Sequence, residues 1–175
     1  MKIIAHRRNT IKELLNTDTK YGIEVDIRSY GRDIITHHEP LTKGENFNKW
    51  ISEYNHGTLI LNVKEEGLES HLIKIMDEKG IDDYFFLDQS FPFLIKWSNL
   101  GEKRCAVRIS EYESVKTALT LSGKVNWVWV DCFTHFSLTK QDFESLKEAG
   151  FKICLVSPEL QGRDAKKEIQ LLADD

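Results

Sequence analysis

The sequence predicts an α/β fold, because segments typical of strands and of helices alternate along the chain. Seven short runs are rich in β-branched and aromatic residues: 2–5, 22–28, 58–64, 84–88, 104–110, 125–133 and 151–156. Between them, apolar residues recur with helical spacing at 10–15, 68–79, 110–120, 140–149 and 164–172. Such alternation predicts a parallel sheet covered by helices, either open or closed as a short (β/α) TIM-type barrel variant with seven strands in this chain.

The composition is that of an ordinary globular chain. Its 175 residues are 41% hydrophobic and carry a formal net charge of -4, so we expect a single domain over residues 1–175 and no nucleic-acid partner. No apolar run approaches the roughly 20 residues of a membrane span. Arg7 and Arg8 interrupt the N-terminus too early for a secretory signal. We therefore expect a soluble cytoplasmic protein without a membrane span.

The three cysteines support the same expectation. Cys105, Cys132 and Cys154 are odd in number, widely spaced and without the spacing of metal ligands. Each lies in an apolar run, where cysteine behaves as a small hydrophobic residue. We expect buried, reduced thiols, as in a reducing cytoplasm.

The predicted strand 22–28 carries its charge on one face. Its period of two places Glu24, Asp26 and Arg28 opposite three aliphatic residues. Burial of two neighbouring carboxylates costs several kcal/mol per ion unless a cation compensates, so we interpret Glu24 and Asp26 as ligands of a divalent metal. A strand end neutralised by Arg28 and a neighbouring lysine is the alternative.

Polar residues gather at the carboxyl ends of the other predicted strands as well. In parallel α/β folds, the loops at these ends build the active site. Several strands that converge on one polar cluster favour closure into a barrel. The side chains concerned are His6, Asn62, Lys64, Asp88, Arg108, Ser110, Trp129, Asp131, His135 and Glu159.

Residues 30–46 are predicted to form a long excursion after the second strand. The segment contains glycine and histidine residues and a short apolar core at Ile34 and Ile35. Long loops in compact domains are usually functional or disordered. His37 is the residue of this excursion that we expect in the site.

These side chains suit phosphate chemistry. A divalent ion together with Arg7, Lys64 and Arg108 would neutralise charge on phosphoryl oxygens. His6 and His37 form a pair that can remove a proton from a nucleophile and give one to a leaving group. Together, these residues predict a site for acid/base cleavage of a phosphodiester.

Four short segments resemble, in the same order, the HR, ExD, H and LExK signature of the glycerophosphodiester phosphodiesterase-like superfamily. The members of this superfamily are phosphatidylinositol-phospholipase-C-like phosphodiesterase barrels. The segments are Ile3-Ile4-Ala5-His6-Arg7, Gly22-Ile23-Glu24-Val25-Asp26, Ile34-Ile35-Thr36-His37 and Leu61-Asn62-Val63-Lys64. The resemblance implies a phosphodiesterase barrel in which His6 and His37 act as general acid and base. The other implied roles are ligation of Mg²⁺ or Ca²⁺ by Glu24 and Asp26, and phosphate contact by Arg7 and Lys64.

The chain departs from the family pattern at three positions and in length. Arg8 follows the HR pair, where the family usually has glycine, and His38 stands where an aspartate commonly follows the second histidine. Asn62 replaces the third metal carboxylate. Its amide oxygen can still bind a hard cation but adds no charge, so we expect weaker metal affinity. The family barrel has eight strands in a longer chain, against the seven predicted here.

The sequence therefore predicts a metal-dependent hydrolase that cleaves a small, glycerophosphodiester-like substrate. The predicted site comprises His6 and His37 as catalytic residues, Arg7, Lys64, Arg108, Asp131 and Trp129 as substrate-binding residues, and Glu24, Asp26 and Asn62 as ligands of magnesium or calcium.

Two other functions remain open at this point. A degenerate, non-catalytic barrel would bind a phosphorylated ligand through Arg7, Lys64 and Arg108. A barrel lyase would use Lys64 as a Schiff-base amine. A homodimer is a further open question, because a second subunit can cover an exposed sheet edge.

Overall fold

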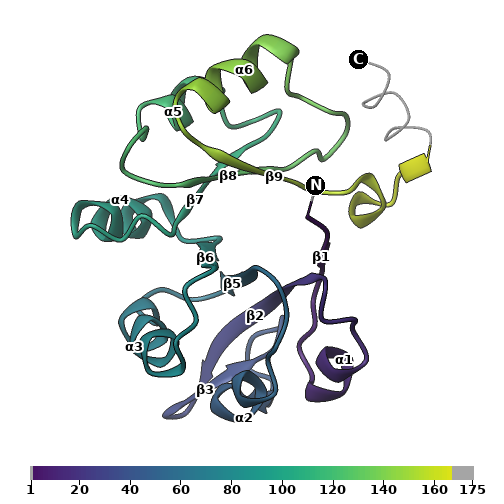
Figure 1. Ribbon diagram of the computed structural model, residues 1–175, viewed down its shortest axis with the longest axis vertical. Helices are drawn as coiled ribbons and strands as arrows, with labels where there is room; N and C mark the ends of the chain where they lie inside the picture. The colour runs from purple at the N-terminus through teal and green to yellow at the C-terminus, as the bar shows by residue number, and fades with distance from the viewer. Residues whose placement is uncertain (1, 167–175) are drawn as a thin grey trace. The chain divides into compact units, whose positions relative to one another are not determined.

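The computed structural model describes residues 2–166, which fall into two compact units divided between Lys96 and Trp97 (Figure 1). The first unit contains β1 (Ile4–Ala5), α1 (Ile11–Leu15), β2 (Gly22–Tyr30), β3 (Asp33–Thr36), β4 (Glu45–Asn46), α2 (Phe47–Ser52), β5 (Leu59–Val63), α3 (Glu69–Lys79) and β6 (Tyr84–Leu87). Helix α4 (Phe91–Asn99) crosses the division. The second unit contains β7 (Ala106–Ile109), α5 (Val115–Leu119), β8 (Trp127–Val130), α6 (Lys140–Glu148), β9 (Lys152–Leu155) and the 3-10 helix Pro158–Gln161.

Strand β2 is the centre of the first unit's sheet, whose order is β4-β3-β2-β5-β6. The pairs β1–β2, β2–β5 and β5–β6 are parallel, whereas β3 pairs with β2 and with β4 antiparallel. Since β1, β2, β5 and β6 run in the same direction, their carboxyl ends lie at one edge of the sheet. The register sets Asp26 of β2 beside Asn62 of β5.

The core of the first unit covers both faces of β2, including the face that carries the charge. Ile23, Val25 and Ile27 are fully buried, and they alternate with Glu24 and Asp26, which are buried as well. Helix α2 packs on β3 and β4 and buries two large aromatic side chains, Phe47 and Trp50. Both faces of the strand are therefore covered, and the carboxylates must find their partners inside the protein.

The second unit is a three-stranded parallel sheet in the order β7-β8-β9. Val107, Ile109, Val128 and Val130 are buried in its core, and α6 contributes the buried Leu146. Two capping hydrogen bonds fix the start of α6, because Thr139 and Asp142 each bind the other's backbone N–H.

The predicted alternation of strands and helices is confirmed, and each of the seven predicted runs contains a strand. Helices also form within the predicted segments 10–15, 68–79 and 140–149. The predicted segment 110–120 begins its helix only at Val115, because the side chain of Ser114 caps the N–H of Thr117 and a bridge joins Ser110 to Glu113. The predicted helix 164–172 lies mostly outside the described residues.

The predicted excursion 30–46 is wrong in one respect, since it folds back as β-structure. Strand β2 continues to Tyr30, Gly31 takes a positive φ of 65°, and β3 then returns antiparallel to β2. Glycine adopts this left-handed conformation without the steric cost of a side chain, which permits the tight hairpin. The four residues of β3 are too short a run to stand out in the sequence. Helices α2 and α4 were likewise not predicted.

No closed barrel is found among residues 2–166, whose strand pairings form one sheet in each unit. Across the same residues, no helix has both the length and the apolar character needed to cross a membrane. The three cysteines are free, and burial raises the pKa of Cys154 to about 12.

Candidate active site

Three oxygen-bearing side chains meet at the carboxyl end of the β2–β5 pair. Glu24 and Asp26 project from the same face of β2, and Asn62 lies opposite Asp26 on β5. The side-chain amide of Asn62 donates to Oε1 of Glu24 at 2.8 Å. At most 5% of any of these residues is exposed. The structure thus brings together the three residues predicted as metal ligands.

Asn9 is part of this cluster, although sequence reasoning missed it. Its side-chain amide donates to Oδ2 of Asp26 at 2.7 Å, and its Oδ1 accepts the backbone N–H of Asp26 at 2.9 Å. The hydroxyl of Thr36 in turn donates to the carbonyl of Asn9 at 2.6 Å. An asparagine in a polar loop two residues beyond Arg7 gives no sequence signal for this role.

Lys64 connects the cluster to the end of β6. Its ammonium lies 2.8 Å from Oδ2 of Asp88 and 3.4 Å from Oδ1 of Asp26. Asp88 has a positive φ of 60°, a conformation that aspartate tolerates better than most residues. The predicted convergence of Asp88, Lys64 and Asp26 is therefore observed within the first unit.

The segment after β1 places His6 and Arg7 against Glu24. The backbone N–H of Arg7 donates to Oε2 of Glu24 at 2.6 Å, and Nε2 of His6 lies 3.7 Å from the same oxygen. Arg7 has a φ of 51°, which is uncommon for a residue with a side chain. Its own bond to Glu24 and a bond from the N–H of Arg8 to the Glu24 carbonyl hold this conformation.

The two adjacent histidines after β3 have different surroundings. His37 is anchored by its backbone N–H to the carbonyl of Asp26, and its Nδ1 accepts the N–H of Glu39 at 3.0 Å. Its Nε2 makes no hydrogen bond among the described residues. His38, by contrast, uses both nitrogens: Nε2 accepts from the guanidinium of Arg7 at 2.7 Å and Nδ1 lies 2.6 Å from the carboxylate of Glu39. The available imidazole nitrogen thus belongs to His37.

Arg28 shares the charged face of β2 but does not neutralise its carboxylates. Its guanidinium donates to the carbonyl of His38 at 2.9 Å and to the carbonyl of Lys64 at 3.2 Å. Arg28 therefore ties the loop after β3 to the end of β5. The alternative interpretation required Arg28 and a neighbouring lysine to neutralise the carboxylates. Lys64 does lie near Asp26, whereas Arg28 binds backbone carbonyls instead.

Burial shifts the pKa of two groups in the cluster. Desolvation, reinforced by the neighbouring charge of Asp26, raises the pKa of Glu24 to about 7. Burial and the neighbouring guanidinium of Arg7 lower the pKa of His6 from its ordinary value. A neutral His6 near pH 7 can accept a proton, which suits a general base.

The donor set of the cluster fits a hard cation. The ligands of Mg²⁺ and Ca²⁺ are oxygens, and all three predicted ligands offer them. Oδ1 of Asp26 and Oδ1 of Asn62 are buried and accept no hydrogen bond among residues 2–166. The described part of the chain holds no group of three or more His, Cys, Asp or Glu residues placed to bind a metal. The third predicted ligand, Asn62, carries an amide instead of a carboxylate.

Arg108, Trp129 and Asp131 form a cluster within the second unit. Oδ2 of Asp131 lies 3.8 Å from Nε of Arg108 and 3.3 Å from Nε1 of Trp129, which donates to it. Gln161, which the sequence did not single out, donates to the other oxygen of Asp131 at 3.2 Å. Glu111 is a second residue missed from the sequence, and its carboxylate accepts the backbone N–H groups of residues 133–135.

No protein-family profile and no curated protein matches the sequence. The fold, however, is a known one. It matches a crystal structure from Agrobacterium tumefaciens described as "Putative glycerophosphoryl diester phosphodiesterase", with a TM-score of 0.68 over 88% of this chain and 83% of that chain. The sequence identity is 10%.

This likeness confirms the expected resemblance at the level of the fold. An identity of 10% carries no residue roles from one protein to the other. The roles of the predicted catalytic, substrate-binding and metal-binding residues therefore stay predictions, which rest on the local geometry of each unit.

Proposed function

We propose that this protein is a metal-dependent phosphodiesterase that hydrolyses small glycerophosphodiester-like substrates. The observation that supports it most is the buried cluster of Glu24, Asp26 and Asn62, flanked by the imidazole of His6 and the ammonium of Lys64. Lys64 and Arg7 form ion pairs with Asp26 but not with Glu24. A further cation would offset the cost of burying both carboxylates. Their position at the carboxyl ends of parallel strands is where α/β folds bind ligands.

Each group has a part in the proposed reaction. His6 or His37 removes a proton from the attacking water or from a neighbouring hydroxyl of the substrate, and the other imidazole protonates the departing alkoxide. Lys64 and Arg7 bind the phosphate oxygens. A Mg²⁺ or Ca²⁺ ion held by Glu24, Asp26 and Asn62 would supply charge stabilisation at the phosphoryl group.

Several finer predictions belong to the same proposal. They are the barrel variant, the substrate-binding roles of Arg108, Trp129 and Asp131, the single domain, the cytoplasmic location and the homodimer.

A non-catalytic role in binding phosphorylated ligands is the second candidate. One observation favours it: an amide stands at position 62, where a third carboxylate would strengthen metal binding. The barrel lyase is less well supported, because the ammonium of Lys64 forms ion pairs with Asp88 and Asp26.

A substrate screen tests the proposal. Glycerophosphodiesters and a chromogenic diester are incubated with the protein in Mg²⁺, Ca²⁺, Mn²⁺ or chelator. We expect metal-dependent hydrolysis that falls by roughly 10²-fold in His6→Asn with the protein still folded. Calorimetric binding of such diesters without turnover would instead support the non-catalytic candidate. An unchanged rate in His6→Asn would remove the role of that imidazole.

A further inference from the structure

Asn9 binds Asp26 through both ends of its side-chain amide. The amide nitrogen donates to Oδ2 of Asp26 at 2.7 Å, and Oδ1 of Asn9 accepts the backbone N–H of the same aspartate at 2.9 Å. The last torsion of an aspartate side chain has only a broad preference of its own, so a hydrogen bond to one oxygen decides how the carboxylate is turned. One side chain thus fixes both the backbone and the carboxylate of Asp26.

The backbone around Asn9 is anchored by three other hydrogen bonds. The N–H of Arg8 donates to the carbonyl of Glu24 at 2.9 Å, and the indole N–H of Trp50 donates to the carbonyl of Arg8 at 2.9 Å. The hydroxyl of Thr36 donates to the carbonyl of Asn9 at 2.6 Å. Trp50 and Thr36 are both buried. The amide of Asn9 is therefore presented to β2 by a loop that β2, β3 and α2 already hold.

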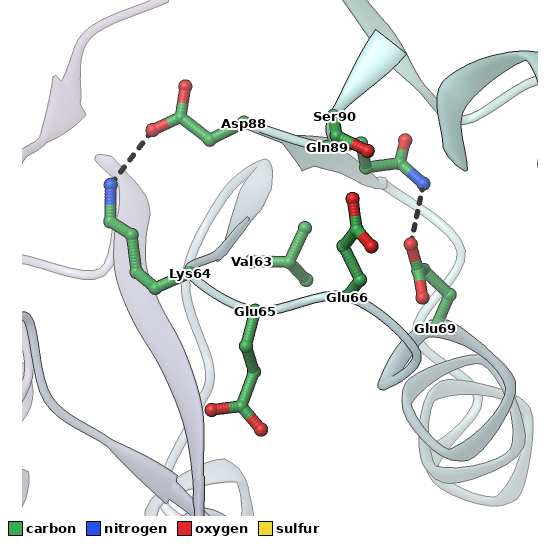
Figure 2. A pocket seen from close by; sticks show the side chains of 8 residues that line it. All are labelled: Val63, Lys64, Glu65, Glu66, Glu69, Asp88, Gln89 and Ser90. Atoms are coloured by element: carbon green, nitrogen blue, oxygen red, sulfur yellow. Dashed lines mark hydrogen bonds and ion pairs between the residues drawn. The ribbon is translucent and has the colours of Figure 1, made fainter. Parts of the chain in front are cut away.

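The two carboxylate oxygens of Asp26 have different surroundings. Oδ2 accepts the amide of Asn9, and Nε of Arg7 lies 3.9 Å from it. Oδ1 is buried and accepts no hydrogen bond in the described part of the chain. The ammonium of Lys64 lies 3.4 Å from Oδ1, but it donates its hydrogen bond to Asp88 at 2.8 Å (Figure 2). Oδ1 is therefore the oxygen of Asp26 that is left for a cation.

We propose that Asn9 is a positioning residue, which makes Asp26 bind the divalent cation through Oδ1 alone. The inference rests on the proposed function, which assigns Asp26 as a metal ligand. A carboxylate that binds through one oxygen suits Mg²⁺, because this ion requires a nearly octahedral arrangement of ligands. Ca²⁺ also accepts a carboxylate through both oxygens. Asn9 therefore raises the affinity of the site for Mg²⁺ relative to its affinity for Ca²⁺.

A purely structural role for Asn9 would have a different signature. Asn9 would then only satisfy the buried backbone N–H of Asp26, and its loss would lower the stability of the protein. Lower stability weakens the binding of both ions together, since both bind the same folded site. The two ions also carry the same charge. The ratio of the Mg²⁺ and Ca²⁺ affinities therefore separates positioning of the carboxylate from general stabilisation.

Calorimetric titration of the metal-stripped protein with Mg²⁺ and with Ca²⁺ tests the inference in wild type and in Asn9→Ala. We expect the Mg²⁺ affinity of Asn9→Ala to be lower by roughly tenfold or more, the usual effect of removing a group that orients a metal ligand. The Ca²⁺ affinity should fall less, because the released Oδ2 can join Oδ1 on the ion. The ratio of the two affinities should therefore shift toward Ca²⁺.

Thr36→Val is the matched control. It removes the hydrogen bond to the carbonyl of Asn9 and leaves the amide of Asn9 in contact with Asp26. Both variants should unfold at a lower urea concentration than wild type, because each loses a hydrogen bond in the same loop. Only Asn9→Ala should change the ratio of the Mg²⁺ and Ca²⁺ affinities. An equal change of the ratio in both variants would show that Asn9 merely supports the loop, and would overturn the inference.

Infrared spectroscopy tests the same inference on wild type, so the test remains valid if Asn9→Ala fails to fold. A carboxylate bound to a metal through one oxygen has a wider separation between its antisymmetric and symmetric stretching bands than one bound through both. Isotopic labelling of the aspartate carboxyl carbons separates the bands of Asp26 from those of Glu24. We expect the wide separation for the labelled bands that change when Mg²⁺ or Ca²⁺ is added. A narrow separation would overturn the inference.

The titration also distinguishes failure of this inference from failure of the proposed function. It needs no substrate, so the rate of hydrolysis does not enter the result. An absence of saturable binding of both ions in wild type would contradict the proposed metal site and the role of Asn9 together. Saturable binding in wild type, with an affinity ratio that Asn9→Ala leaves unchanged, would overturn the role of Asn9 and leave the proposed function standing.

Discussion

Glu24 is a buried carboxylic acid whose protonation should control the stability of the metal-free protein. Its pKa rises from 4.5 to about 7 on folding, so the folded chain holds this proton more tightly than the unfolded chain. Its stabilising contribution is fully present below about pH 4.5 and is lost as the pH rises through about 7. In Glu24→Gln this pH dependence should disappear.

Urea unfolding in chelator at about pH 5 and about pH 8 measures the effect. The unfolding free energy of wild type minus that of Glu24→Gln should fall by about 2–3 kcal/mol over this interval. Parallel pH curves for the two proteins would show that Glu24 does not titrate in this way.

His37 and His38 should respond very differently to substitution. His37 keeps an Nε2 without a hydrogen bond in the described residues, whereas both nitrogens of His38 are engaged by Arg7 and Glu39. His37→Asn should therefore lower kcat for a diester by roughly 10²-fold. His38→Asn should act mainly on KM, because it releases the guanidinium of Arg7. A larger fall in kcat for His38→Asn would reverse the assignment.

For single residues, the sequence indicated which side chains would cluster better than it indicated their individual contacts. The charged alternation of 22–28 singled out Glu24 and Asp26 because two carboxylates on one strand face are rare. Asn9 binds Asp26 just as directly, but one amide in a loop carries no comparable pattern. The distinct surroundings of His37 and His38 depend on where Arg7 and Glu39 lie, which spacing alone cannot show.

Strand β2 is the element on which the candidate site depends, and Gly22 fixes how closely it can be packed. A Cβ at this position would lie 2.6 Å from the carbonyl oxygen of Thr58 and 3.0 Å from a side-chain carbon of Ile4. Gly22→Ala should therefore push β2 away from its neighbours and cost about 1–3 kcal/mol of unfolding free energy.

Chemical unfolding in urea measures this cost. Lys74→Ala, on the exposed side of α3, is the control and should stay within about 0.5 kcal/mol of wild type. If Gly22→Ala were as stable as that control, the backbone of β2 would accommodate the added methyl group without loss of unfolding free energy.

The strands were predictable wherever a run was long or strongly patterned. The parallel strands β2 and β5 show continuous apolar or alternating character over five residues or more. By contrast, β3 has four residues and β4 has two, so their pairing with β2 and with each other decides their conformation. Helix α2 begins directly after β4 with the side chain of Asn46 as its cap, but one asparagine is a weak local signal for a helix of six residues.

For the whole molecule, the sequence predicted the fold resemblance from four short motifs in order, and the structural match bears it out at 10% identity. A closed barrel was not predictable in the same way, because strand closure depends on pairings between distant segments rather than on local pattern. Local sequence pattern likewise gave no indication of how Arg108, Trp129 and Asp131 contact one another within the second unit.

In the proposed site, Glu24, Asp26 and Asn62 share one divalent cation. Calorimetric titration of the metal-stripped protein with Ca²⁺ and Mg²⁺ tests it directly, with Asp26→Asn and Asn62→Asp as the informative variants. We expect saturable binding in wild type, loss of binding in Asp26→Asn, and tighter binding in Asn62→Asp, because the added carboxylate supplies charge at the third predicted ligand. An absence of saturable binding in wild type, or an affinity that neither substitution changes, would contradict it.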